Sequence, residues 1–352
     1  MGLILIFIIA IIFRLINLID FHSLESDEAL YAQVVSLLSK GFLPYRDIFV
    51  GHPPLYFYIA VPFYWIVPHL YSIRLFNVIL SVAILYLLFL LCRLAYSERV
   101  ATFTLFIYAV YPFAIYSSKL ILVDNAVALF TALAALFLVQ YIRKNNLRYV
   151  ALSGFVAGVS CMTKFTGIFF FTAIFLFTIF RIRRVGAIIF FVLGFIIFPL
   201  LTLLSLLYTG IWEVFYAQTI AWQFIRFGLY PTEKLWFGIQ GIVILSPLIV
   251  SALLKARKGD NNVHDELMFF LFLIPLIFIL LFKVIFLQYF IALLIPLCVL
   301  TARFIVNSFH ANFSFSNNHL LTKRKYSKKS VIKATILIVT IFFCWNLNTK
   351  TC

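Results

Sequence analysis

The chain has 352 residues, of which 64% are hydrophobic and only 11% are charged. Soluble proteins hold roughly 45–50% apolar residues, so this composition excludes an ordinary soluble domain and predicts an all-α polytopic membrane protein. The 28 Lys and Arg residues outnumber the 12 Asp and Glu residues and give a formal charge of +16. These basic residues fall mainly in alternate loops between apolar segments. They therefore indicate membrane topology and not a nucleic-acid partner.

Apolar segments long enough to cross a bilayer recur along nearly the whole chain. We expect about eleven spans of this kind. They lie near residues 2–19, 70–92, 99–117, 122–142, 149–163, 166–180, 185–208, 236–254, 266–282, 284–302 and 331–346. Basic clusters occupy every second loop, which predicts that these loops and the N-terminus face the cytoplasm. The remaining loops would then lie outside the cell membrane.

The span pattern divides the chain into three parts. Residues 1–302 form a transmembrane module that includes a long outer loop at residues 20–69. Residues 303–330 form a basic cytoplasmic linker suited to anionic lipid, and residues 331–352 hold a final span and a short tail. No soluble domain of ordinary size fits, so the functional groups should lie in loops or at the borders of the spans.

The outer loop contains the stretch SLESDEALYAQ, in which three carboxylates crowd into four positions. Apolar residues follow at helical spacing and predict an amphipathic helix on the membrane surface: Leu30, Val34, Leu37 and Leu38. Asp27 and Glu28 stand in its first turn. A carboxylate there can simply cap the helix, or it can be aimed from this rigid turn at a substrate. The two roles are compatible.

Three lysines occur in short outer turns, namely Lys119, Lys164 and Lys283. Each alone could be an anchor that extends to the membrane surface. Together, facing acidic residues on one side of the membrane, they outline a cationic cluster that suits a lipid-linked phosphate. Asp27 could remove a proton from an acceptor hydroxyl while the lysines stabilise the departing phosphate. The pattern thus permits transfer of a sugar from a polyprenyl-phosphate donor.

A divalent metal is the alternative stabiliser of the phosphate. The sequence contains no DxD motif, and its six histidines lack the spacing of metal ligands. We therefore expect a site without metal or other cofactor. His52, which precedes two prolines, is predicted to be a fixed loop residue or a phosphate contact.

Six segments in this order resemble the GT-C membrane glycosyltransferases: SDEALYAQ, GHPPLYFY, SIRLFN, SSKLILVDNAVALF, MTKFTG and KVIFLQYFIALLIPL. The likeness covers about residues 1–300. Within the GT-C family the chain is similar to the members related to protein O-mannosyltransferases and to the lipid A aminoarabinose transferase. It implies a GT-C-like fold and an inverting transfer on the extracytoplasmic face. The acceptor would be a hydroxyl of a protein, lipid or glycan.

The resemblance also implies roles for particular residues. Asp27 would be the catalytic base, with Glu28 beside it and Asp124 as a second acidic position. The expected donor-phosphate contacts, including one aromatic and one arginine of structural or phosphate-facing role, are His52, Lys119, Lys164, Lys283, Tyr289 and Arg74. Two positions depart from the pattern, because the aminoarabinose transferase looks to have lysine in place of His52 and many relatives have arginine in place of Lys119.

The main alternative is a transporter or a flippase for lipid-linked sugars. Such proteins tend to show paired halves and ionisable residues near mid-membrane. The sequence shows no internal repeat, and acidic residues are almost absent from the centres of the predicted spans. The enzyme interpretation is therefore favoured.

Overall fold

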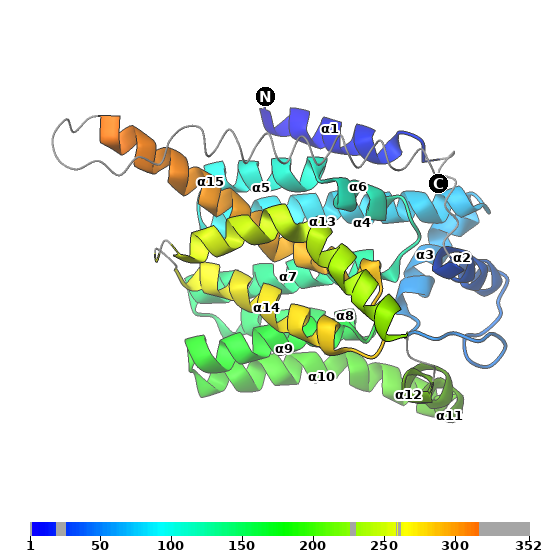
Figure 1. The fold of residues 1–352 in the computed structure, drawn as a ribbon. Coiled ribbons are helices and arrows are strands. Elements are labelled where there is room, and N and C mark those ends of the chain that lie inside the picture. The colour runs from blue at the N-terminus through cyan, green and yellow to red at the C-terminus, as the bar shows by residue number, and fades with distance from the viewer. Residues whose placement is uncertain (1, 19–25, 226–229, 258, 260–261, 317–352) are drawn as a thin grey trace.

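The computed structural model describes residues 2–18, 26–225, 230–257, 259 and 262–316. Within these ranges the regular elements are helices, and one isolated bridge joins Pro44 and Ile48. Long helices run side by side across the view, and α2, α3, α11 and α12 gather at the right-hand end (Figure 1). The predicted all-α fold is confirmed.

The helices follow one another with short connections. In chain order they are α1 (Gly2–Leu15), α2 (Ser26–Ser39), α3 (Leu55–Ile66), α4 (Leu70–Ala95), α5 (Glu98–Val110), α6 (Pro112–Ser118), α7 (Val123–Lys144), α8 (Leu147–Cys161), α9 (Gly167–Phe177), the π-helix η1 (Thr178–Ile182), α10 (Val185–Tyr208), α11 (Trp212–Phe215), the π-helix η2 (Tyr216–Ala221), α12 (Trp222–Ile225), α13 (Pro231–Arg257), α14 (Val263–Leu281), the 3₁₀-helix η3 (Leu287–Leu293) and α15 (Leu294–Ser316).

Six helical stretches in the described part are long and apolar enough to cross a membrane: α4, α7, α10, α13, α14 and residues 287–308. A seventh results if α5 and α6, which are bent by 61°, form one broken span. Shorter apolar helices are α1, α3, α8 and the run Gly167–Ile182. The chain is a multi-pass integral membrane protein, but the expected count of eleven spans is not confirmed.

Each expected span up to residue 302 overlaps at least one helix of the structure, although the span 99–117 is divided between α5 and α6. The last expected span, 331–346, lies outside the described residues, as does the linker beyond residue 316. Residues 303–316 continue helix α15, so this part of the expected linker is helical.

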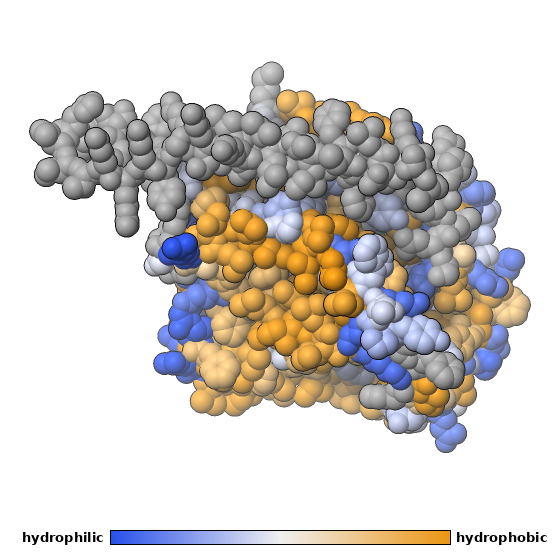
Figure 2. Space-filling view, viewed as in Figure 1, coloured by the Kyte–Doolittle hydropathy of each residue, from blue (hydrophilic) through white to orange (hydrophobic). Residues whose placement is uncertain are grey.

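An apolar belt covers the outside of the helices. α10 exposes most of its apolar side chains, and only 17% of the residues in its most apolar stretch are buried. Figure 2 shows a broad hydrophobic face bounded by hydrophilic residues at its left and right ends. An apolar surface of this extent is stable in contact with lipid tails and unfavourable in contact with water.

Arg14 explains how a charged residue is accommodated in the first apolar helix. Pro112 has no N–H group, so it leaves the carbonyl of Tyr108 without its helical partner at the break between α5 and α6. Arg14 is fully buried and donates to that carbonyl at 3.3 Å, to the carbonyl of Ala109 at 3.0 Å and to Ser81 Oγ at 2.9 Å. The charge therefore joins α1 to the bent pair and to α4.

Helices α8 and α10 approach each other through glycines. A Cβ atom on Gly154 would lie 2.0 Å from the carbonyl oxygen of Phe191, and one on Gly194 would lie 2.1 Å from that of Ala151. Small residues allow this backbone contact, which is a usual basis of helix association in membranes. Gly154 and Gly194 are thus required by the packing of α8 on α10.

Replacing Gly154 by Ala should destabilise the protein by about 1–3 kcal/mol, because the added methyl group must push the two helices apart. Gly186→Ala is the matched control, since its Cβ would meet only a Leu147 side chain at 3.9 Å. Thermal unfolding in detergent should show a lower midpoint for Gly154→Ala than for Gly186→Ala. Equal midpoints would contradict this expectation and show that the close approach of α8 and α10 does not limit the stability of the protein.

The basic loops meet at one end of the bundle. Contacts that join these loops are Arg143 Nη1 with the Leu94 carbonyl at 3.2 Å, Arg184 with Asn145, and Arg181 with Glu266. Across the connection from α13 to α14, Lys255 lies 3.2 Å from Asp265. The opposite end carries α2, α3 and the turns that hold Asp27, Asp124 and Lys164. This separation matches the alternation of charged loops in the sequence.

Candidate active site

Helix α2 begins with the two carboxylates that the sequence singled out. Acidic groups are favoured here because the first turn presents unpaired N–H groups and the positive end of the helix dipole. Glu28 is fully buried and receives two hydrogen bonds from Arg74 of α4, at 2.8 and 2.9 Å. It also accepts from the backbone N–H of Ile121 at 3.2 Å. Glu28 and Arg74 therefore fix α2 against the bundle.

Asp27 points in a different direction and stays partly exposed. Its Oδ2 atom accepts a hydrogen bond of 2.9 Å from Gln288 Nε2. Gln288 is buried in η3, 261 positions farther along the chain. This contact orients the carboxylate from a second element, while partial exposure leaves it open to a substrate.

Asp124 and Lys164 form a buried ion pair beside Asp27. Lys164 Nζ lies 2.7 Å from Asp124 Oδ2, and the two residues are only 3% and 4% exposed, respectively. The same ammonium lies 4.6 Å from the centre of the Tyr289 ring, which adds a cation–π contact. Asp27 is near enough for its charge to interact with both members of the pair. Gln288, the hydrogen-bond partner of Asp27, directly precedes Tyr289 in η3, so Asp27 and the ion pair meet at the same short helix.

A tight turn between α8 and α9 places Lys164. The Lys164 N–H donates to the Ser160 carbonyl at 3.1 Å, and the Gly167 N–H donates to the Lys164 carbonyl at 2.9 Å. A Cβ on Gly167 would lie 2.7 Å from the carbonyl carbon of Ser160, so glycine is needed for this close return of the chain. The turn brings the lysine to the N-terminal turn of α7, where Asp124 stands.

His52 joins the site through Tyr31, a residue that the sequence analysis missed. Tyr31 Oη lies 2.9 Å from His52 Nε2, and the buried tyrosine is within electrostatic range of Asp27 and Asp124. The sequence held a signal for Tyr31, because residues four apart share one face of a helix and Tyr31 follows Asp27 by four positions. Gln288 had no comparable signal.

The two remaining lysines take different positions. Lys119 is buried at the end of α6 and donates to the carbonyl of Ile16 at 2.7 Å, so it caps the end of α1. Lys283 is exposed just before η3, the element that carries Gln288 and Tyr289.

The structure thus brings Asp27, Asp124, Lys164 and Tyr289 together, with His52 attached through Tyr31, and these residues are called the Asp27 cluster below. Phosphate contacts by Lys119 and Lys283 stay predictions.

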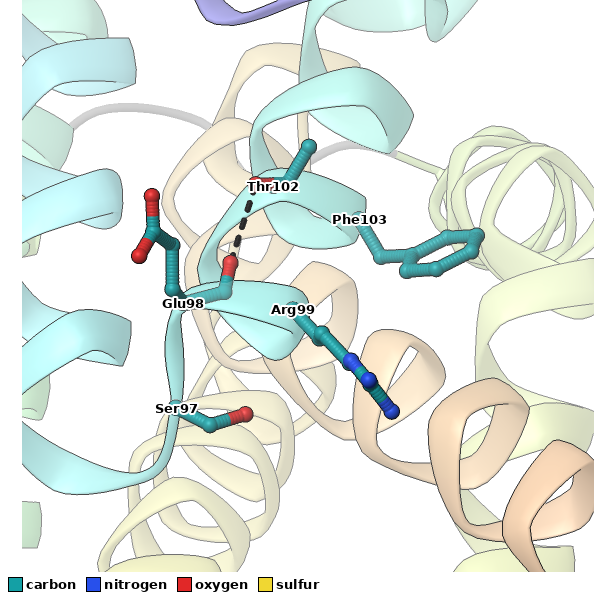
Figure 3. A pocket seen from close by; sticks show the side chains of 5 residues that line it. All are labelled: Ser97, Glu98, Arg99, Thr102 and Phe103. Atoms are coloured by element: carbon teal, nitrogen blue, oxygen red, sulfur yellow. Dashed lines mark hydrogen bonds between the residues drawn. The ribbon is translucent and has the colours of Figure 1, made fainter.

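A pocket lies far from the Asp27 cluster, at the start of α5, and its lining residues are Ser97, Glu98, Arg99, Thr102 and Phe103. Figure 3 shows the Glu98 and Arg99 side chains pointing to different sides, while Thr102 Oγ1 donates to the Glu98 carbonyl. No charged groups converge there on a shared point. This pocket belongs to the end with the basic loops and offers no chemistry like that of the Asp27 cluster.

The described residues contain no group of three or more His, Cys, Asp or Glu side chains arranged to hold a metal ion. In the Asp27 cluster each carboxylate is already engaged, Asp27 by Gln288 and Asp124 by Lys164. Activity without a metal stays a prediction.

Comparison with known proteins places this geometry in a fold. The family model of dolichyl-phosphate-mannose-protein mannosyltransferases matches residues 51–208, which is under half of the chain. The crystal structure of ArnT from Cupriavidus metallidurans bound to undecaprenyl phosphate superposes with a TM-score of 0.71 over 97% of this chain, at 13% sequence identity. The protein has the GT-C glycosyltransferase fold. It resembles protein O-mannosyltransferases and ArnT, as the sequence motifs indicate.

A second GT-C structure supports this assignment. The archaeal oligosaccharyltransferase AglB from Archaeoglobus fulgidus, in complex with an inhibitory peptide and a dolichol-phosphate, matches 96% of the chain with a TM-score of 0.61 and 14% identity. The chain spans 63% of the length of ArnT and 53% of that of AglB. No sequence of a curated protein matches this GT-C chain.

Proposed function

We propose that the protein is an integral membrane glycosyltransferase that moves a sugar from a polyprenyl-phosphate donor to an acceptor hydroxyl. The observation that carries this proposal is the Asp27 cluster, in which a partly exposed carboxylate stands beside a buried lysine and an aromatic ring. Support for the donor class comes from the neighbours, because the ArnT structure holds undecaprenyl phosphate and the AglB structure holds a dolichol-phosphate.

In the proposed reaction the acceptor oxygen forms a bond to the anomeric carbon of the donor sugar. The acceptor proton passes to Asp27, and the bond between the anomeric carbon and the phosphate oxygen breaks with its electron pair staying on that oxygen. This is a single displacement that inverts the anomeric configuration. A phosphate is a good leaving group without protonation, so one base and fixed cations suffice.

Three neighbours of Asp27 in the cluster also have a part in this reaction. Lys164 has three N–H donors, of which Asp124 accepts one, so the ammonium can also meet the phosphate. Asp124 holds Lys164 in place, and His52 contacts the phosphate from the first outer loop. Glu28 and Arg74 hold α2 against α4 in this proposal, and they do not exchange protons with the substrate.

We place the reaction on the extracytoplasmic face. The basic loops gather at the opposite end of the bundle, and such loops are retained in the cytoplasm. The hydrocarbon tail of the donor would lie along the apolar belt while its phosphate reaches the Asp27 cluster.

The test uses purified protein in liposomes that contain labelled polyprenyl-phosphate sugars, with a membrane extract as the source of acceptors. We expect labelled sugar to move to an acceptor with release of one polyprenyl phosphate per transfer. Movement of the intact donor across the bilayer without any release would instead identify a flippase and contradict the proposal.

A further inference from the structure

The outer loop that carries His52 has little regular structure of its own. Residues 41–54 lie between α2 and α3, and Tyr45 adopts a positive φ of 69°. Tyr45 N–H donates to the Ile48 carbonyl at 2.9 Å, which closes a small turn. The phenol of Tyr45 donates to the carbonyl of His52 at 2.8 Å. The position of His52 therefore depends on how Tyr45 and its neighbours are held.

A distant segment holds this loop. The amide of Gln218 uses both of its ends, since Oε1 accepts from the Val50 N–H at 3.0 Å and Nε2 donates to the Tyr45 carbonyl at 3.2 Å. Gln223 Nε2 donates to the Gly51 carbonyl at 3.3 Å. Backbone groups directly before His52 are thus bonded by side chains from a segment that lies more than 160 positions away.

Aromatic contacts reinforce the same pairing. The rings of Tyr45 and Phe215 meet edge to face with their centres 5.0 Å apart, and those of Phe49 and Trp222 meet in the same way at 5.9 Å. Such pairs add to the stabilisation from buried area alone. The segment from α11 to α12 packs on the loop through both polar and apolar groups.

Gln218 lies within the π-helix η2, Tyr216–Ala221. Such turns are rare and are found frequently at functional sites, because the extra residue redirects side chains relative to an α-helix. Gln218 also lies beyond residues 51–208, the part that the family model matches.

We infer that Gln218 is a positioning residue for the donor phosphate: it holds the loop of residues 45–51 so that His52 meets Tyr31 and keeps its place in the Asp27 cluster. The inference rests on the proposed function and adds a link to it. Because residues 212–225 hold the loop that precedes His52, a change at Gln218 should alter donor binding through the position of His52.

The test measures binding of undecaprenyl phosphate to four proteins: wild type, Gln218→Met, His52→Ala and the double variant. Methionine keeps the size of glutamine but removes both hydrogen bonds. We expect Gln218→Met to weaken binding about three- to tenfold. The double variant should bind like His52→Ala alone, because Gln218 acts only through His52. Effects that multiply in the double variant, or wild-type affinity in Gln218→Met, would overturn the inference.

Two further variants keep the test decisive. Gln33→Met, on the exposed face of α2, makes the same chemical change and should bind like the wild type. Gln218→Glu keeps an acceptor for the Val50 N–H but sets a carboxylate oxygen against the Tyr45 carbonyl. If Gln218→Met does not fold, Gln218→Glu enters the same cycle and the same outcomes apply.

Hydrogen exchange separates failure of this inference from failure of the proposed function. The peptide of residues 45–53 should exchange faster in Gln218→Met than in Gln33→Met, whether or not the protein binds the lipid. If the wild type binds no undecaprenyl phosphate, the proposed function falls and exchange still decides the positioning role. Equal exchange in both variants would refute that role.

Discussion

Replacing Asp27 by Asn is expected to lower the rate of sugar transfer by about 10²- to 10⁴-fold, the usual contribution of a general base. Asparagine keeps the size of the side chain and can still accept the hydrogen bond from Gln288, but it cannot take a proton from the acceptor. Donor affinity should be unchanged or higher, since in the proposed site the substitution removes a negative charge near the phosphate. Turnover and equilibrium binding of the donor, measured on the same preparation, separate the two effects.

The matched control for Asp27→Asn is Glu98→Gln, which makes the same carboxylate-to-amide change at the other end of the bundle. Glu98 is exposed and starts α5, so its substitution should leave turnover unaffected. Wild-type turnover in Asp27→Asn would refute the assignment of this residue as the base.

Removing the cation at Lys164 should affect both stability and donor binding. In Lys164→Met the carboxylate of Asp124 stays buried without its partner, and a broken buried ion pair typically costs about 3–5 kcal/mol. Adding Asp124→Asn removes the stranded charge and should restore most of the stability. Donor binding should stay at least about tenfold weaker in the double variant, because the fixed charge that we propose as the phosphate contact is gone.

This pair of variants distinguishes a structural from a functional ion pair. The thermal midpoint reports the first role, and affinity for undecaprenyl phosphate together with turnover reports the second. Lys40→Met, at an exposed position directly after α2, controls for loss of a lysine. A double variant that binds and turns over like the wild type would show that Lys164 and Asp124 only stabilise the fold.

The sequence predicted the elements of this protein better than their contacts. Helix α2 was predicted from apolar spacing and from the acidic residues in its first turn. Its apolar residues do not share one environment, because Leu30 is 43% exposed, whereas Val34 and Leu38 are buried together with Tyr31. In a membrane protein an apolar side chain can face lipid as well as the core, so apolar spacing alone does not tell which face is inward.

Contacts between distant segments had no local signal. Gln288 is 261 positions from Asp27, and Arg74 is 46 positions from Glu28. Neither partner could be named from spacing, since both depend on how the bundle closes. The break between α5 and α6 is a different case, because Pro112 was visible in the sequence inside a stretch that was predicted to be one span, 99–117.

The most direct test is a single-turnover assay with a labelled polyprenyl-phosphate sugar and acceptor extract in chelator-treated liposomes, with wild type beside Asp27→Asn. It measures free polyprenyl phosphate as it appears. We predict rapid release by the wild type and release slowed by about 10²- to 10⁴-fold in the variant. Equal release by both proteins, or release by the wild type only after a divalent metal is restored, would contradict a metal-independent transfer with Asp27 as its base.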